Sequence, residues 1–268
     1  MAADGFAGKS FFTGSFYYHG HPLTEGPVYG MSLKAAGSMR FRWNESNPVR
    51  DDFLRSISGD DHETVAVELI HSRNVFAVDS PDEVLGVQGD GIITSNKSLI
   101  PVVTVADCMP IYLFDPVTEV FGMLHSGWKG TGIVRNAIEL AENRYGSRRS
   151  DFCVVMGPHI HGCCYFVGEE RAQYFRVNFT PDCVREVVPS AFSDRRHTGS
   201  YSLSLAEANR AILEEMGVNE QSIVTYSDCT CCNPLFGSFR RETENLPQEM
   251  DLQERQRHFT VQAAWVKW

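Results

Sequence analysis

The sequence lacks the features expected of a nucleic-acid-binding or membrane protein. Its 24 lysine and arginine residues are outnumbered by 34 aspartate and glutamate residues, which gives a formal net charge of −10 at pH 7. Surfaces that bind phosphate backbones are rich in clustered basic residues. No apolar run approaches the ~18 residues of a membrane span. We therefore expect neither a nucleic-acid partner nor a membrane association.

Export signals and a disulfide framework are also lacking. The N-terminal residues MAADGFAGKSFFTG contain no basic segment followed by a long apolar stretch, which is the pattern of a secretory signal. Eight cysteines in 268 residues are too few for a small disulfide scaffold. Four of these cysteines are neighbours in sequence, as Cys163-Cys164 and Cys231-Cys232, a spacing that is not typical of structural disulfide bonds. We expect a soluble, cytoplasmic protein with reduced thiols, some of which have a chemical role.

The sequence does contain enough apolar residues, 43%, for a large core. No repeat or linker divides the chain, so we interpret residues 1–268 as one domain. Short β-rich runs between turn residues indicate strands from residue 64 onward. Helical spacing of apolar residues predicts helices over 130–145 and 203–216, and we also expect helices over 51–58 and 168–176. Strands and helices interleave without a steady βαβ rhythm, which favours an α+β fold of mixed, largely antiparallel sheets layered with helices.

The segments PIYLF and EVFGML are typical of a hairpin that turns at residues 115–118, where proline suits the second turn position. A hairpin centred between residues 116 and 117 places Cys108 directly opposite His125. Directly opposed residues have Cβ atoms about 4.5–5.5 Å apart, so a thiolate and an imidazole there could share one zinc ion or one proton. Pro110 removes a ladder donor and could end the pairing before it reaches Cys108.

A third potential metal ligand, His71, follows the strand predicted over 64–70. Three protein ligands with one open position are typical of catalytic zinc, although an isolated Cys or His on a strand is most often simply packed. After His125, the segment SGWKGTG leads into the helix predicted over 130–145. Free N–H groups at that helix end, together with Lys129, would attract phosphate or carboxylate; alternatively, the glycines only supply a tight turn.

Two further segments concentrate reactive residues. The segment GPHIHGCCY, residues 157–165, combines histidines, thiols and turn formers, a composition that predicts a site loop rather than a core element. Near the C-terminus, Cys229-Thr230 precedes FGSFRR, residues 236–241. The adjacent arginines could bind an anion, although paired charges more often face solvent.

Together these segments resemble the laccase-domain, or polyphenol oxidoreductase-like, family. The resemblance rests on ADC (106–108), HSGWKG (125–130), GP through CCYFVG (157–168), CT (229–230) and FRR (239–241), in the family's order, and it covers roughly residues 64–241. It implies a mixed α/β fold, and a zinc ion held by His71, Cys108 and His125. It also implies phosphorolysis of purine nucleosides, namely adenosine, inosine and guanosine, with accompanying adenosine deamination.

The implied reactions assign roles to individual residues. In phosphorolysis C1′ of the ribose develops positive charge while phosphate attacks, so the site must hold an anion. In deamination a zinc-activated water would attack C6 of adenine, with Asp107 or His161 as acid or base. The residues predicted to bind phosphate or substrate are Lys129, His159, His161, Cys164, Tyr165 and Arg240.

The sequence departs from the family pattern in ways that predict an altered substrate preference. Leu69 and Ser72 stand where the family has Gln and Gly around His71. Lys129 replaces Arg, which keeps the charge but loses the bidentate fork, and Phe166 replaces Glu. The Asp that usually precedes Ala-Asn-Arg, residues 208–210, is missing, as is the Gly-Arg after the double arginine.

Three alternative functions stay open at this point. One is a metal-free hydrolase with Cys108 as nucleophile and His125 as base. Another is copper-dependent oxidation of phenols, for which one Cys and two or three His supply at most one copper site. The third is a non-catalytic partner of cell-wall metabolism, against which the retained Cys108 and His125 argue. The sequence does not indicate an oligomeric state.

Overall fold

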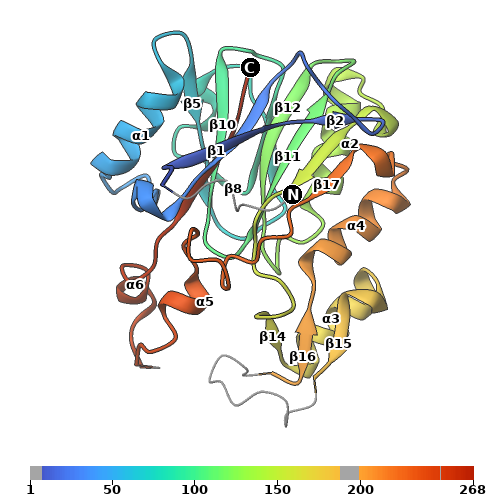
Figure 1. Ribbon diagram of the computed structural model, residues 1–268. Coiled ribbons are helices and arrows are strands. Elements are labelled where there is room, and N and C mark those ends of the chain that lie inside the picture. Colours follow the sequence, from blue (N-terminus) through green and yellow to red (C-terminus); the bar gives the residue numbers. More distant parts are fainter. Residues whose placement is uncertain (1–7, 188–198, 248) are drawn as a thin grey trace.

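The computed structural model describes residues 8–187, 199–247 and 249–268 (Figure 1). Residues 1–7, which belong to the N-terminal segment in which the sequence indicates no export signal, lie outside the described residues. Two large sheets dominate the described part. The five-stranded sheet has the order β1 (Phe11–Ser15), β4 (Val28–Ser32), β18 (Gln262–Lys267), β10 (Leu99–Val105) and β5 (Glu63–Val65). The six-stranded sheet has the order β17 (Ile223–Thr225), β13 (Cys153–Met156), β11 (Met109–Asp115), β12 (Val120–Ser126), β9 (Gly91–Thr94) and β7 (Val75–Ala77).

Smaller elements surround these sheets in the described residues. Three short strands form a third sheet with the order β14 (Phe166–Val167), β16 (Tyr201–Leu203) and β15 (Val184–Glu186). Two strand pairs are β2 (Tyr17–Tyr18) with β3 (His21–Pro22), and β6 (Glu68–Leu69) with β8 (Gln88–Gly89). The α-helices are α1 (Pro48–Ser58), α2 (Ile133–Tyr145), α3 (Glu169–Asn178), α4 (Leu205–Glu215), α5 (Phe239–Glu242) and α6 (Leu252–Arg255). Short 3₁₀ turns lie at Lys34–Ala36, Pro81–Val84, Arg149–Asp151, Pro181–Cys183 and Glu220–Ser222.

The fold is layered as helix, sheet, sheet and helix. Apolar residues from the facing sides of the two large sheets, such as Tyr29 and Tyr112, form one core between them. Helices α2 and α4 bury a second core against the other face of the six-stranded sheet, and α3 extends this core beside the three-stranded sheet. Helix α1 packs through Leu54 on the outer face of the five-stranded sheet, and Figure 1 shows α1 on the opposite side of the molecule from α2 and α4.

Local signals account for the helix ends. The side chain of Asn47 accepts a hydrogen bond from Arg50 N at 3.2 Å and Pro48 occupies the first turn, which begins α1. Gly146 has a φ of 73°, the left-handed conformation that ends α2. Ser204 caps α4 by accepting from Glu207 N at 3.2 Å. The four predicted helices are therefore confirmed within a few residues at each end.

The predicted register of the β11–β12 hairpin was wrong by two residues. Pro110, rather than Cys108, lies opposite His125, and Asp115 lies opposite Val120. The hairpin closes through a four-residue loop, because the Asp115 carboxylate accepts from Val117 N at 2.8 Å and Glu119 takes a φ of 58°. A shift of two residues keeps each side chain on its face of the sheet. Cys108 thus stays on the same side as His125, just before β11 begins.

The fold class is confirmed. Most strand pairs are antiparallel, and the parallel ones join β10 with β5, β13 with β17, β6 with β8, and β7 with β9. Among the described residues, no helix is both long and apolar enough to cross a membrane. The assignment of residues 1–268 to one domain stays a prediction.

Candidate metal centre and pocket

His71, Cys108 and His125 meet at one point, as the sequence predicts. Their ligand atoms all lie within 4.8 Å of one another, and the rings of His71 and His125 have centroids 4.8 Å apart. The three residues come from different elements: His71 follows β6, Cys108 precedes β11 and His125 lies in β12. One thiol and two imidazoles are the ligand types of zinc and copper sites, so this group could hold one metal ion.

The buried carboxylate of Asp90 positions two of the three residues. Its Oδ1 lies 2.8 Å from Nδ1 of His125 and accepts from the backbone N of His71 at 2.9 Å. Its Oδ2 accepts from Ser72 N at 2.5 Å and from Ser72 Oγ at 2.6 Å. Burial alone would raise the pKa of Asp90, but hydrogen bonds from His125 and Ser72 outweigh burial and lower it. The ionised carboxylate only accepts, so Nδ1 of His125 carries a proton and its Nε2 faces the site.

Cys108 and His125 form a charged pair when no metal is bound. Burial would raise the pKa of Cys108, but the positive charge of His125, with hydrogen bonds from His125 and His71, lowers it to about 6. Burial would lower the pKa of His125, but Cys108 and Asp90 raise it to about 10. A thiolate at neutral pH is the form that binds a soft metal or acts as a nucleophile.

Residues in and next to the trio have uncommon backbone conformations. Among the described non-glycine residues with positive φ are His71 at 59° and Asp107 at 77°, a conformation that costs about 1–3 kcal/mol and collects at functional sites. Gly127 follows β12, and a Cβ there would lie 2.9 Å from Sγ of Cys108 and 3.4 Å from His71. Only glycine leaves room for both ligands at this position.

A pocket of about 450 Å³ opens beside the trio, within the range of about 300–1,000 Å³ typical of small-molecule sites. Its wall includes His71, Cys108 and His125. Aromatic side chains also line it, namely Phe41, Trp128, Tyr165, Phe239 and Phe259. Four arginines also line it, namely Arg40, Arg42, Arg171 and Arg240. The pocket therefore combines a metal-ligand group, flat apolar surfaces and positive charge.

The predicted residues Tyr165, Arg240 and Asp107 all line this pocket. The Arg240 guanidinium carbon lies 6.0 Å from the centre of the Tyr165 ring. Asp107 accepts hydrogen bonds from Thr230 Oγ1 at 2.6 Å, Ser238 Oγ at 3.0 Å and Arg240 N at 2.7 Å. Burial raises the pKa of Asp107 in spite of these three donors. The carboxylate of Asp107 thus holds the segment that carries Arg240 against the pocket.

The other predicted contacts lie outside the pocket wall. Lys129 is exposed, and its Nζ lies 5.4 Å from the Trp128 ring centre. His159 is buried, with Nδ1 2.8 Å from the Gly157 carbonyl oxygen, and burial together with the neighbouring His161 lowers its pKa to about 3. His161 is half-buried, with burial lowering its pKa. Cys164 belongs to a separate thiol cluster. The substrate roles of these four residues stay predictions.

Sequence reasoning missed Asp90 and Arg171. Asp90 is a single acidic residue placed directly before the apolar run GIIT, and the only sequence signal for it is this position beside a strand that is buried in the structure. Arg171 lies in α3, where neighbouring glutamates make it look like ordinary surface charge. The structure stacks its guanidinium carbon 4.2 Å from the Trp128 ring centre, with Nη1 donating to Tyr165 Oη at 3.4 Å.

Comparison with known proteins agrees with this fold. The family model described as multi-copper polyphenol oxidoreductase laccase matches residues 46–248. The chain belongs to this family. Its described residues present one mixed His/Cys group that could hold a metal ion.

Individual relatives carry nucleoside-related names. The chain is 36% identical over 158 residues to a protein of Bacillus subtilis named purine nucleoside phosphorylase YlmD, a match that spans 57% of this chain and 54% of that protein. It is 32% identical over 192 residues to YlmD of Geobacillus stearothermophilus, spanning 66% of this chain and 67% of that protein. A protein named adenosine deaminase RL5, from an unknown prokaryotic organism, is 30% identical over 171 residues, which is 62% of each chain.

The fold is also that of solved structures. The crystal structure of YlmD from Geobacillus stearothermophilus superposes with a TM-score of 0.73 at 23% identity, covering 94% of this chain and 98% of that one. The sequence match to the Bacillus subtilis relative covers only about half of that protein's length.

Proposed function

We propose that this protein is a zinc-dependent purine nucleoside phosphorylase with accompanying adenosine deaminase activity. The observation that carries the proposal is the position of the His71, Cys108 and His125 group in the wall of a pocket lined by aromatic and arginine side chains. Relatives named for these two activities support it. The substrates are adenosine, inosine and guanosine, with phosphate as the acceptor.

The aromatic wall suits a purine. Trp128 and Tyr165 offer flat faces on which a base can stack, and stacking contacts of this kind contribute about 1–3 kcal/mol per base. Leu69 also lines the pocket at a position where the family usually has Gln. An apolar side chain there cannot donate or accept a hydrogen bond, so we propose a base preference that depends less on polar contacts at this edge.

The positive charge suits phosphate. Arg40 and Arg42 pair with Glu45 and Glu68 at 2.8 and 3.0 Å. Arg171 Nη1 donates to Tyr165 Oη at 3.4 Å, and the Arg240 guanidinium carbon lies 6.0 Å from the centre of the Tyr165 ring. We propose that these two guanidinium groups hold the phosphate that attacks C1′, because arginine binds phosphate with two parallel hydrogen bonds. Asp107 is a positioning residue, since it anchors the backbone of Arg240.

The donor set fits zinc. His71, Cys108 and His125 supply three ligands, and the carboxylate of Asp90 orients His125 as outer-shell carboxylates do in zinc sites. When bound, zinc supplies Lewis-acid chemistry and brings the pKa of a water toward about 7. The described residues hold one mixed His/Cys group and one all-cysteine group, which do not supply the several histidine-rich sites of a multicopper cluster. We therefore favour zinc over copper.

A second function has a specific observation in its favour. Cys108, His125 and Asp90 are arranged as nucleophile, base and orienting carboxylate, as in a cysteine hydrolase. His71 has no part in such a mechanism, whereas it is a ligand in the zinc proposal. A His71→Ala variant that keeps full turnover without metal would favour the hydrolase.

The test is nucleoside turnover in matched variants of the zinc-loaded protein. Cys108→Ala is expected to abolish release of base from inosine and deamination of adenosine. Arg171→Ala is expected to raise the KM for phosphate at least tenfold, because a hydrogen bond to a charged group contributes about 1.5–3 kcal/mol. Arg144→Ala removes an exposed arginine that pairs with Asp79 at 2.7 Å and serves as the control. Full activity in Cys108→Ala would refute the proposal.

A further inference from the structure

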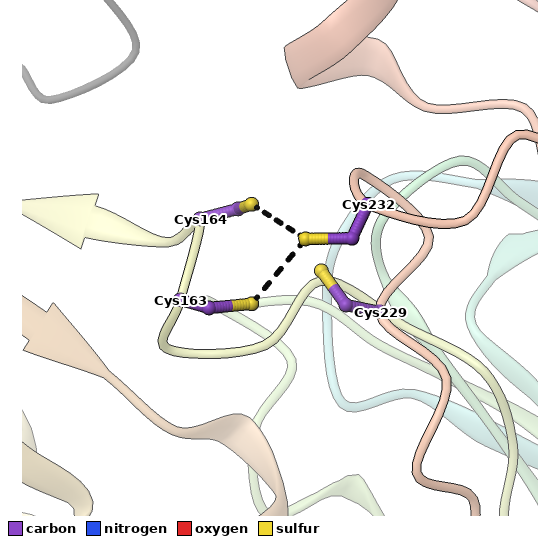
Figure 2. A group of neighbouring side chains, drawn as sticks. All are labelled: Cys163, Cys164, Cys229 and Cys232. Atoms are coloured by element: carbon purple, nitrogen blue, oxygen red, sulfur yellow. Dashed lines mark hydrogen bonds between the residues drawn. The ribbon is translucent and has the colours of Figure 1, made fainter. Parts of the chain in front are cut away.

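A second group of side chains lies near the pocket and takes no part in the proposed function. Figure 2 shows Cys163 and Cys164 on one loop and Cys229 and Cys232 on another, with their thiols directed toward one another. The four Sγ atoms all lie within 4.8 Å of one another. Cys163 and Cys232 are exposed, whereas Cys164 and Cys229 are buried. The cluster is therefore reachable from solvent and closed on its inner side.

The sulfur separations match a shared metal ion better than a disulfide. Sγ of Cys232 lies 3.6 Å from Sγ of Cys163 and 3.3 Å from Sγ of Cys164, and all four thiols are free. A disulfide requires about 2.05 Å between sulfurs. Four sulfurs placed tetrahedrally at about 2.3 Å from zinc lie about 3.8 Å from one another.

The backbone around the thiols supports the same interpretation. Cys229 and Cys232 have the C-x-x-C spacing of thiolate zinc sites, and Cys232 N donates to the Cys229 carbonyl at 3.1 Å, closing a tight turn. The backbone N of His161 donates to Sγ of Cys229 at 3.4 Å, which favours a thiolate at that position. Thr230 N donates to the His159 carbonyl at 3.0 Å, so the two loops are already joined beside the cluster.

We propose that Cys163, Cys164, Cys229 and Cys232 form a second, all-thiolate zinc site with a structural role. Four protein ligands leave no open position, and closed sites of this kind stabilise folds rather than catalyse reactions. The first loop also supplies Tyr165 to the pocket wall.

Helix α5, which follows the second loop, supplies Arg240 to the same wall, so the metal would connect two parts of the pocket wall. Both loops contact Asp107, through Ile160 N at 2.9 Å and Thr230 Oγ1 at 2.6 Å. A zinc ion at the four cysteines therefore fixes the segments that place Tyr165, Asp107 and Arg240 relative to one another.

The first experiment counts zinc in the full-length protein and its variants by elemental mass spectrometry. The wild type is expected to hold two zinc ions per chain. Cys108→Ala is expected to hold one, because only the mixed site is lost. The double variant Cys163→Ser/Cys232→Ser is also expected to hold one, and the combination of all three substitutions none. Two zinc ions in the double variant would overturn the proposal, as would a wild-type zinc count of one that Cys108→Ala reduces to zero.

Control variants test which thiols bind. Cys231→Ala removes the neighbouring buried thiol, and Cys183→Ala removes a thiol that donates to the Thr180 carbonyl at 2.9 Å; both are expected to keep two zinc ions. Loss of one zinc ion from either control would contradict the assigned set of ligands.

A spectroscopic measurement tests whether four cysteines bind the second zinc ion even if the double variant Cys163→Ser/Cys232→Ser does not fold. X-ray absorption of Cys108→Ala, which retains the four cysteines, is expected to show only sulfur neighbours, at about 2.3 Å from zinc. Nitrogen or oxygen neighbours would overturn the assignment. Iron with inorganic sulfide, or disulfide bonds detected by intact mass, would overturn it as well.

Discussion

Replacing Asp90 by Asn perturbs the proposed metal centre without touching a ligand. The Asp90 carboxylate accepts four hydrogen bonds, two on each oxygen, from His125, His71 and Ser72. An amide has one accepting oxygen and one donating nitrogen. Whichever way Asn is turned, its NH₂ group faces donors that now have no acceptor. The variant therefore loses either the bonds that orient His125 and His71, which share Oδ1, or those that hold Ser72, which share Oδ2.

Mutations of such outer-shell partners cost about 10–100-fold in metal affinity, or about 1.4–2.8 kcal/mol. We expect the upper end, because Asp90 contacts both histidines of the trio. Competition with a chromophoric chelator measures the affinity in the wild type and in Asp90→Asn.

The matched control for this substitution is Asp115→Asn, at the opposite end of the β11–β12 hairpin. Asp115 is also buried, and it accepts from Val117 N and Thr118 Oγ1 at 2.8 and 2.6 Å. That variant is expected to lose thermal stability but to bind zinc at the mixed site as the wild type does. The positioning role of Asp90 would be refuted if Asp90→Asn bound zinc within twofold of the wild-type affinity while His125→Ala bound it clearly more weakly.

Two further predictions concern the same site. In the metal-free protein the rate of alkylation of Cys108 is expected to rise with pH through a midpoint near 6, since His125 and His71 lower the pKa of this thiol to about 6; a midpoint near 8.5, the value of an ordinary thiol, would contradict this. In His125→Ala the midpoint is expected to move upward, and bound zinc is expected to protect the thiol. Gly127→Ala is expected to lower zinc affinity at the trio, because the new methyl group would lie 2.9 Å from Sγ of Cys108; unchanged affinity by chelator competition would show that the turn yields without cost.

The parts of the fold that the sequence predicts are those fixed by neighbouring residues. The end of α2 is predicted from Gly146, because caps act within one turn. The start of α1 is marked by Asn47 and Pro48, a few residues before the predicted bound at 51. The hairpin register depended instead on how Asp115 bonds to the loop after it and on the left-handed conformation of Glu119. The preference of Pro116 for the second position of a turn does not predict either of these two features.

The candidate site divides in the same way. Cys108 and His125 are predictable because one hairpin brings them together, and a register error of two residues does not change their face. Arg40 and Phe259 reach the pocket only through tertiary packing of segments far apart in the chain, and nothing local predicts that meeting. Lys129 has the motif position of a phosphate ligand, yet its side chain is exposed beside Trp128, because the turn after β12 directs Trp128 to the pocket.

Phosphate-dependent release of base from inosine by the zinc-loaded protein tests the proposed function most directly. Chromatography would follow inosine, free hypoxanthine and ribose 1-phosphate, with and without phosphate, in the wild type and in Cys108→Ala. The account predicts hypoxanthine and ribose 1-phosphate only when both zinc and phosphate are present, and none from the variant. No turnover of inosine, adenosine or guanosine by a protein shown to contain zinc at His71, Cys108 and His125 would contradict it.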